Sequence, residues 1–246
     1  MLAIITPTGL EAAELLPLLT EKRALPGNYS LTRGQIGGCP IVLLTCGIGK
    51  TNAAAASATL LQQLPISRVV MLGCGGAYLG SDLRVGDLAV ATAEIHGDEG
   101  CETRDGFLDM EALQLPVRKG LGGTCDYNRF PVAPTSPECR ALLQRFGVNC
   151  GVRVGFGPFV TVSRCSGLTS LGAELEQRTG GICENMEGAA VAQICVRFDI
   201  PFHEIRGISN LVEDRNTRRW DIPVAARIAQ QALLDLLASG FGEEAT

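Results

Sequence analysis

Two segments decide the fold: Cys-Glu-Asn-Met-Glu-Gly-Ala-Ala at residues 183–190 and Ile-Arg-Gly-Ile-Ser-Asn at residues 205–210. Between them, residues 188–198 carry apolar side chains at helical spacing, which predicts a helix with one face against a sheet. Residues 201–209 are mostly apolar, which predicts a buried strand. The chain therefore contains a strand, helix, strand unit of the kind that builds α/β sheets.

Polar side chains stand at both ends of this unit. Glu187 falls where the helix begins, and the next strand carries Arg206 and delivers Ser209 and Asn210 to its end. Open α/β sheets bind ligands at the carboxyl ends of their strands, so we expect these side chains to share one site on two neighbouring strand ends. Taken singly, each has an ordinary alternative, because acids are favoured in a first helical turn and Asn is common in turns.

The combination resembles a known family. Met-Glu-x-Ala-Ala followed by Ile-Arg-x-Ile-Ser-(Asp or Asn) is similar to the purine nucleoside phosphorylase and nucleosidase superfamily, which includes the methylthioadenosine and S-adenosylhomocysteine nucleosidases. Within it, residues 209–212, 214 and 215 with Trp220 are most similar to the futalosine hydrolases of the alternative menaquinone pathway. The resemblance implies an α/β fold with three layers, αβα, in which helices flank a central twisted mixed sheet. It also implies one domain over residues 1–246 and assembly into homodimers or higher homo-oligomers.

Composition limits the partners and the compartment. The chain has 246 residues, 46% hydrophobic and 19% charged, which suits one α/β domain with a substantial core. A net charge of -5 without a basic run argues against nucleic acid or a membrane surface as the partner. Ten scattered cysteines without a signal peptide indicate a reduced, cytoplasmic protein. Only two histidines are present, neither at metal-ligand spacing, so we expect no metal and no cofactor.

The remaining elements follow from periodicity and from turn residues. Strands are predicted at residues 2–5, 30–36, 40–46, 68–72, 84–93 and 152–162, and helices at residues 10–19, 136–146 and 222–237. Residues 96–137 are rich in Gly, Pro and Asp, and so long a loop is more often functional or interfacial than idle. The family resemblance places this segment at the mouth of the site and at the dimer contact.

Glycine-rich turns follow two of these strands. Gly-Ile-Gly-Lys-Thr at residues 47–51 invites comparison with a phosphate-binding P-loop, but only one residue separates its glycines where that motif needs four before Gly-Lys. The cluster at residues 73–77 allows backbone N–H groups to approach a ligand. By resemblance, Cys74 and Gly75 contact the ribose and the water site, although the family usually has Ser where Cys74 stands.

The family resemblance gives roles to further residues. Glu11, in the first turn after the first strand, has an ordinary alternative as a solvated acid, but the resemblance implies that it activates the hydrolytic water. Phe159 would stack on the purine, with core packing as its ordinary alternative, and the Val160 backbone would contact the edge of the base. Met186 would pack against the sugar. Arg206 would hold the water with Glu11.

Asn210, supported by Ser209, is the most informative departure from the family. Adenine-specific relatives place Asp there, whereas an Asn amide can donate to the 6-oxo group and N7 of hypoxanthine. A mispaired buried polar group costs about 1–3 kcal/mol, enough to select one base. The expected substrate is therefore a purine nucleoside with a 6-oxo base, and futalosine carries hypoxanthine. The candidates for binding its benzoate group are Arg215, Arg218, Arg219 and Trp220, with a solvated basic turn as the alternative.

Other functions compete with this one. A phosphorylase typically needs arginines near the glycine-rich loops, and here Met71 and Leu72 precede Gly73, which favours water as nucleophile. A methylthioadenosine or S-adenosylhomocysteine nucleosidase is the second alternative. A purine nucleoside sensor on the same fold is the third, although a binder has no need for a water-activating carboxylate.

Overall fold

The computed structural model describes residues 1–120 and 122–242, and its main feature is a ten-stranded mixed sheet. The strands of this sheet are β1 (Leu2–Thr6), β2 (Leu19–Leu25), β3 (Tyr29–Ile36), β4 (Cys39–Thr45), β5 (Arg68–Ala77), β6 (Leu88–His96), β11 (Arg129–Pro131), β12 (Val154–Thr161), β13 (Cys183–Asn185) and β14 (Phe202–Leu211). Their order is β11-β6-β12-β13-β5-β1-β4-β3-β2, and β14 pairs with β5 and β6.

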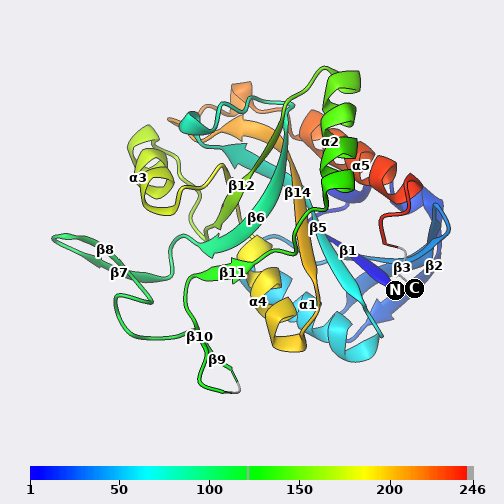
Figure 1. The fold of residues 1–246 in the computed structure, drawn as a ribbon, viewed down its shortest axis with the longest axis horizontal. Coiled ribbons are helices and arrows are strands. Elements are labelled where there is room, and N and C mark those ends of the chain that lie inside the picture. Colours follow the sequence, from blue (N-terminus) through cyan, green and yellow to red (C-terminus); the bar gives the residue numbers. More distant parts are fainter. Residues whose placement is uncertain (121, 243–246) are drawn as a thin grey trace.

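Helices cover both faces of the sheet (Figure 1). On one face lie α1 (Lys50–Gln63) and α4 (Gly188–Phe198), which pack against each other; on the other lie α2 (Pro137–Cys150) and α5 (Ile222–Ala238). The alternation along β1 shows why: Ala3 and Ile5 belong to the first core, whereas Leu2 and Ile4 belong to the second. Each buried strand thus contributes apolar side chains to two cores. The expected three-layer fold is confirmed.

Part of the sheet closes into a ring, whereas the sequence predicted an open sheet. β14 pairs parallel with β5 and antiparallel with β6, while β6, β12, β13 and β5 are paired in sequence, so these strands form a ring. β5 lies between β13 and β14, so the strands that flank α4 are not direct neighbours. A closed ring brings side chains from distant parts of the chain to a common interior.

Several predicted elements have close to their expected bounds. α4 and α5 match the predicted helices, and Ser136 caps α2 by accepting a hydrogen bond from the Cys139 backbone at 3.2 Å. β5 runs five residues further than predicted, from Leu72 through the glycine cluster to Ala77. Glycines do not stop a strand when neighbouring strands satisfy its backbone groups.

The helix predicted at residues 10–19 is wrong. Two short 3-10 turns, η1 (Leu10–Ala12) and η2 (Leu16–Leu18), take its place, because Pro17 cannot continue an α-helix and lies instead at the start of the second turn. The strand β2 that follows was missed, since only its first and last residues are buried and no alternation marks it. The helix α3 (Thr169–Thr179) was missed too, because Gly172 is its one buried residue.

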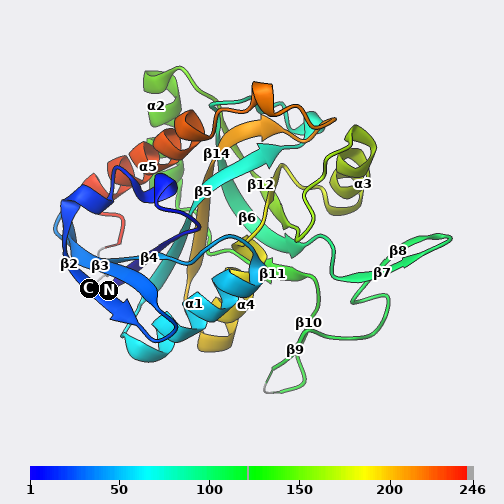
Figure 2. The same cartoon turned by 180° about the vertical axis from the view of Figure 1, so that it is seen from behind.

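The segment from residue 96 to 137 contains short hairpins rather than a bare loop. β7 (Gly100–Thr103) pairs with β8 (Gly106–Asp109), and β9 (Arg118–Lys119) pairs with β10 (Cys125–Asp126). Both hairpins extend away from the main body (Figures 1 and 2). The ten cysteines all lie in the described part of the chain. Among the described residues, no helix combines the length and the apolar character that crossing a membrane requires. The cytoplasmic location stays a prediction.

Candidate active site

A cavity of about 530 Å³ opens at the strand ends around the ring. The loops after β1, β4, β12 and β13 and the ends of β5 and β14 form its wall. Its lining residues are Pro7, Thr8, Leu10, Glu11, Ile48, Cys74, Gly75, Gly76, Cys165, Ser166, Glu184, Asn185, Met186, Glu187, Arg206, Ser209, Asn210, Arg215, Trp220 and Ile222. Glu11 follows the strand predicted at residues 2–5 and Asn210 follows the strand predicted at residues 201–209, and both line this cavity.

Glu11 is buried at this wall, with 6% of its surface exposed. Thr8 Oγ1 donates to Glu11 Oε2 at 2.7 Å, and the Cys74 backbone N–H donates to Oε1 at 2.9 Å. Burial raises the pKa of Glu11 above its ordinary value, although the charge of Arg206 and these hydrogen bonds oppose the rise. The result is a fixed carboxylate with greater basicity than an exposed glutamate.

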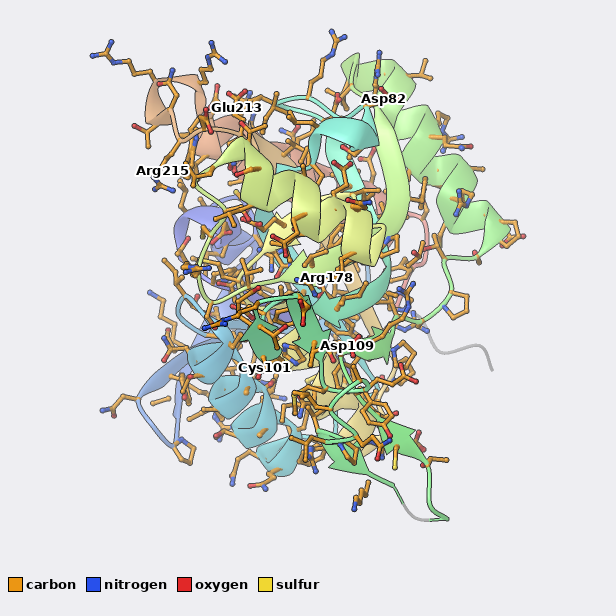
Figure 3. All side chains as sticks on the ribbon, turned by 90° about the vertical axis from the view of Figure 1, so that its left-hand side faces the viewer. Asp82, Cys101, Asp109, Arg178, Glu213 and Arg215 are labelled. Carbon is orange, nitrogen blue, oxygen red and sulfur yellow. The ribbon has the colours of Figure 1, made fainter. Side chains whose placement is uncertain are left out.

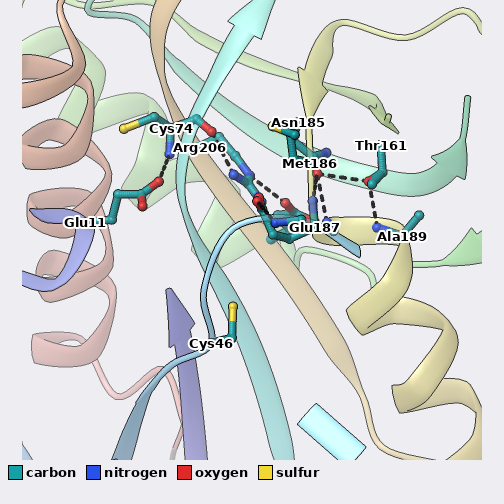
Figure 4. Close-up of polar contacts among 12 residues, drawn as sticks. Glu11, Cys46, Cys74, Thr161, Asn185, Met186, Glu187, Ala189 and Arg206 are labelled. Carbon is teal, nitrogen blue, oxygen red and sulfur yellow. Dashed lines mark hydrogen bonds and ion pairs between the residues drawn. The ribbon is translucent and has the colours of Figure 1, made fainter. Parts of the chain in front are cut away.

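Arg206 lies between Glu11 and Glu187 (Figure 4). Its Nε donates to Glu204 Oε1 at 2.7 Å, and its Nη2 donates to Glu187 Oε2 at 3.2 Å. Its Nη1 donates to the Cys74 carbonyl at 2.7 Å. Burial alone would lower the pKa of Arg206, but the nearby carboxylates of Glu204, Glu187 and Glu11 raise it further than burial lowers it. The guanidinium is therefore a permanent cation held at a fixed position.

Gly73 makes room for this arrangement. A Cβ at Gly73 would lie 2.7 Å from Glu11 Oε1 and 3.1 Å from Arg206 Nη1. Because β5 and β14 pair Gly73 with Arg206, the guanidinium passes over the glycine towards Glu11. A larger residue would push the carboxylate and the cation apart.

Glu187 is the N-cap residue of α4 and 3% exposed. Its Oε1 accepts from the Gly49 backbone N–H at 2.9 Å, so the glycine-rich turn at residues 47–51 binds a carboxylate of the chain itself. Asn185 Oδ1 accepts from the N–H groups of Glu187 and Gly188 at 2.9 and 2.8 Å, and so caps the helix. The side chain of Glu187 is thereby free to face the cavity.

Behind Glu187 and Arg206 lies a buried acid pair that sequence reasoning missed. Glu94 on β6 and Glu204 on β14 are 0% and 1% exposed, and each places an oxygen 2.2 Å from where a Cβ of Gly188 would be. Burial, followed by the charge of Glu204, raises the pKa of Glu94 well above its ordinary value. Burial and this neighbouring charge therefore favour the neutral form of Glu94. Glu204 Oε2, which accepts from no other described group, is the acceptor that faces it.

A hydrogen-bond network that includes Thr161, Asn185 and Ala189 (Figure 4) connects the acid pair to the cavity wall. Asn185 Nδ2 donates to Glu94 Oε1 at 3.0 Å, and Thr161 Oγ1 lies 2.8 Å from Glu94 Oε2. The Ala189 backbone N–H donates to Thr161 Oγ1 at 2.8 Å. Residues from β6, β12, β13 and β14 thus fix the start of α4, and Glu187 with it.

Cys74 acts through its backbone. Its N–H holds Glu11 and its carbonyl holds Arg206, while its Sγ lies 3.6 Å from the Ile222 carbonyl. Burial raises the pKa of the Cys74 thiol to about 12. The thiol therefore stays neutral, and the contacts to Glu11 and Arg206 do not depend on which side chain stands at position 74.

The predicted base-binding residues lie together at the end of β14. Ser209 Oγ lies 2.8 Å from Asn210 Oδ1, and Asn210 Nδ2 donates to the Leu211 carbonyl at 3.0 Å. One N–H of the amide remains for a ligand. Met186 also lines the cavity, 3.4 Å from the sulfur of Cys165.

The mouth of the cavity carries Arg215 and Trp220. The Arg215 guanidinium carbon lies 4.5 Å from the centre of the Trp220 ring, a cation–π contact. Arg215 and Glu213 lie on the same side of the molecule (Figure 3). Arg215 itself is exposed, and its charge is free to meet an anionic group of a ligand.

Phe159 and Val160 are placed elsewhere. Both are 0% exposed and belong to hydrophobic cores rather than to the cavity wall. The loop that follows β12 lines the cavity instead, through Cys165 and Ser166. No described residue of the segment from 96 to 137 lines this cavity, although the resemblance placed that segment at the mouth.

The fold and this geometry identify the family. A sequence profile of the phosphorylase superfamily matches residues 1–239, and the chain belongs to that superfamily. It is 30% identical over 242 residues to futalosine hydrolase of Thermus thermophilus, covering 98% of this chain and 97% of that protein. It is 32% identical over 186 residues to futalosine hydrolase of Streptomyces coelicolor, covering 73% and 71%.

A solved structure agrees in fold. The 5'-methylthioadenosine/S-adenosylhomocysteine nucleosidase of Neisseria meningitidis, in complex with methylthio-immucillin-A, has a TM-score of 0.78 and 25% identity, covering 97% of this chain and 98% of that one. The resemblance found in the sequence motifs is therefore confirmed for the superfamily.

Proposed function

We propose that this chain hydrolyses the N-glycosidic bond of a 6-oxopurine nucleoside, with water as the nucleophile. The observation that carries the proposal is the row of Glu11, Arg206 and Glu187 on the cavity wall, a buried base and a second carboxylate with a fixed cation between them. The relatives named futalosine hydrolase support the same class of reaction.

The row suits the charges that develop in the reaction. Breaking the bond places positive charge on the ribosyl ring, which nearby carboxylates stabilise. Glu11 takes a proton from water, the water oxygen bonds to C1', and the C1'–N9 electron pair leaves with the purine. Glu187 accepts hydrogen bonds from the ribose hydroxyls, and Met186 packs against the sugar. The departing base takes its proton from solvent, since the Asn210 amide donates a hydrogen bond but does not release its proton.

Water is favoured over phosphate by the charge of the wall. Arg206 already holds Glu204 and Glu187, and Glu11 lies within the same group of charges. A phosphate ion at this place would meet carboxylates without a free cation among the lining residues near Glu11. This charge pattern therefore accommodates neutral water better than a phosphate anion as the nucleophile.

We propose futalosine as the natural substrate, in menaquinone biosynthesis. The Asn210 amide supplies the donor that hypoxanthine accepts, and Arg215 with Trp220 offers a cation and an aromatic wall for a benzoate group beyond the 5' carbon. The products would be hypoxanthine and dehypoxanthine futalosine. The similarity to two futalosine hydrolases supports this choice.

We also propose that the active form is a homodimer or a higher homo-oligomer. Leu10, Ile48 and Ile222 line the cavity while 47%, 57% and 39% of their surfaces are exposed. A second copy covering this rim would remove apolar surface from water and enclose the cavity. Sedimentation equilibrium showing a monomer at micromolar concentration would exclude the assembly.

The test is hydrolysis of futalosine, inosine and methylthioadenosine in phosphate-free buffer, with the released base identified by chromatography. Hypoxanthine released from futalosine at the highest kcat/KM is the expected result. Preferential release of adenine from methylthioadenosine would instead indicate a methylthioadenosine or S-adenosylhomocysteine nucleosidase. Tight binding of a nucleoside without release of any base would make the chain a sensor.

A further inference from the structure

One buried carboxylate of the cavity has no part in the chemistry described so far. Glu184 on β13 is 7% exposed and lines the cavity. In the sheet it pairs with Gly76 of β5, and Gly76 pairs on its other side with Asn210 of β14. Side chains of directly paired residues point to the same face of a sheet, so Glu184 and Asn210 share a face.

Gly76 leaves the space between these two side chains open. Two strand spacings, roughly 10 Å, separate the backbones of Glu184 and Asn210. A Cβ at Gly76 would lie 2.9 Å from Asn210 Nδ2, so the amide leans over the glycine. A carboxylate and an amide therefore flank one gap above the sheet, and no side chain of β5 separates them.

The contacts of Glu184 leave one acceptor position free. Its Oε2 accepts from Ser166 Oγ at 2.6 Å and from Tyr78 OH at 3.3 Å, which uses both lone pairs of that oxygen. Its Oε1 accepts from the Ser166 backbone N–H at 2.9 Å. One lone pair of Oε1 remains. Burial raises the pKa of Glu184 above its ordinary value, and the hydrogen bonds from Ser166 and Tyr78 oppose this rise because they stabilise the ionised form.

We propose that Glu184 is a specificity-determining residue that accepts a hydrogen bond from N1–H of a 6-oxopurine. This inference rests on the proposed function. A 6-oxopurine presents a donor at N1 beside acceptors at O6 and N7, and the pair of Glu184 and Asn210 presents an acceptor and a donor. The two patterns are complementary, so both ends of the base are recognised.

The same carboxylate disfavours a 6-aminopurine. Unprotonated N1 of adenine is an acceptor, and it would face the Oε1 lone pair without a proton between them. A buried acceptor without a donor loses about 10- to 100-fold in binding. Glu184 thus disfavours adenine because its Oε1 acceptor is left without a donor, while Asn210 favours hypoxanthine by its N–H.

The test compares inosine with 1-methylinosine, which lacks the N1 proton, and with adenosine. Wild-type enzyme should cleave inosine about 10-fold or more faster than 1-methylinosine, by kcat/KM. Glu184→Met, which removes the acceptor, should reduce this preference to within about threefold. Glu184→Gln should keep most of it, because the Ser166 N–H holds the amide oxygen at the Oε1 position.

Tyr78→Phe is the matched control, since it removes a contact to Oε2 and leaves Oε1 intact. It should keep the preference for inosine over 1-methylinosine. Equal cleavage of both nucleosides by wild-type enzyme would overturn the proposal, even if no variant folds. So would equal losses on all substrates in the Gln and Met variants. A wild-type enzyme that cleaves only adenosine would instead refute the proposed function.

Discussion

Replacing Glu94 by Gln should make the free energy of unfolding fall less as the pH rises. Glu94 is fully buried beside Glu204, and burial together with that charge raises its pKa in the folded state. Above the ordinary pKa of a glutamate, about 4.3, the unfolded chain releases this proton and the folded chain keeps it. Folding therefore takes up a proton. The stability contributed by the proton is present at low pH and is lost as pH rises towards the raised pKa.

The size of the effect follows from proton linkage. One proton bound only in the folded state changes the free energy of unfolding by about 1.4 kcal/mol per pH unit. Gln has no proton to release. The stability of Glu94→Gln relative to wild type should therefore increase by up to about 1.4 kcal/mol for each pH unit above 5.

Urea unfolding at pH 5, 6, 7 and 8 measures this difference. Glu21→Gln, on the exposed face of β2, is the control, and its curve should run parallel to that of the wild type. Parallel curves for Glu94→Gln and wild type would refute the assignment of a proton to the Glu94 and Glu204 pair.

Further predictions concern the cavity itself. Glu11→Gln should lower kcat by about 100-fold or more with a small change in KM, because the base is lost and the shape of the side chain is kept. In the wild type, log kcat/KM should fall as the pH decreases through the pKa of Glu11, which burial raises above its ordinary value. A value of kcat/KM that stays constant towards low pH would contradict this role. Asn210→Asp should move preference from inosine towards adenosine, and unchanged relative rates would disprove the role of the amide. Arg215→Ala should raise KM for futalosine and hardly for inosine; equal effects on both would remove the benzoate contact. Gly73→Ala should reduce activity on every substrate while circular dichroism shows a folded protein, since its Cβ would displace Glu11 and Arg206; full activity would contradict the geometry.

The sequence predicts the central unit well because its signals are local. The helical spacing of residues 188–198 and the apolar run at 201–209 lie within single elements, and α4 and β14 have nearly the predicted bounds. Glu187, Arg206 and Asn210 are found on one cavity because each follows or lies on a strand of the same unit.

The acid pair could not be found in this way because it depends on pairing between distant strands. Glu94 and Glu204 are far apart in sequence and meet only because β14 closes the ring onto β6. A signal was nevertheless present: Glu94 stands between Ala93 and Ile95 in an apolar strand, where an unpaired charge is costly. Glu184 similarly lay within the deciding segment but became meaningful only through its register with Gly76.

Phe159 and Val160 show the opposite error, in which resemblance outweighed burial. An aromatic residue in an apolar strand is usually part of the core, and Phe159 belongs to the core shared with α1 and α4. The loop after β12, which has no periodic pattern, supplies Cys165 and Ser166 to the cavity instead.

The most direct test of the central claim is the fate of isotopically labelled water. Futalosine hydrolysed in phosphate-free buffer containing heavy-oxygen water should yield free hypoxanthine and a sugar product with one labelled oxygen at C1', as measured by mass spectrometry. Glu11→Gln should lose this labelled product. A sugar phosphate that forms only when phosphate is added, with no label at C1', would contradict the account and make phosphate the nucleophile.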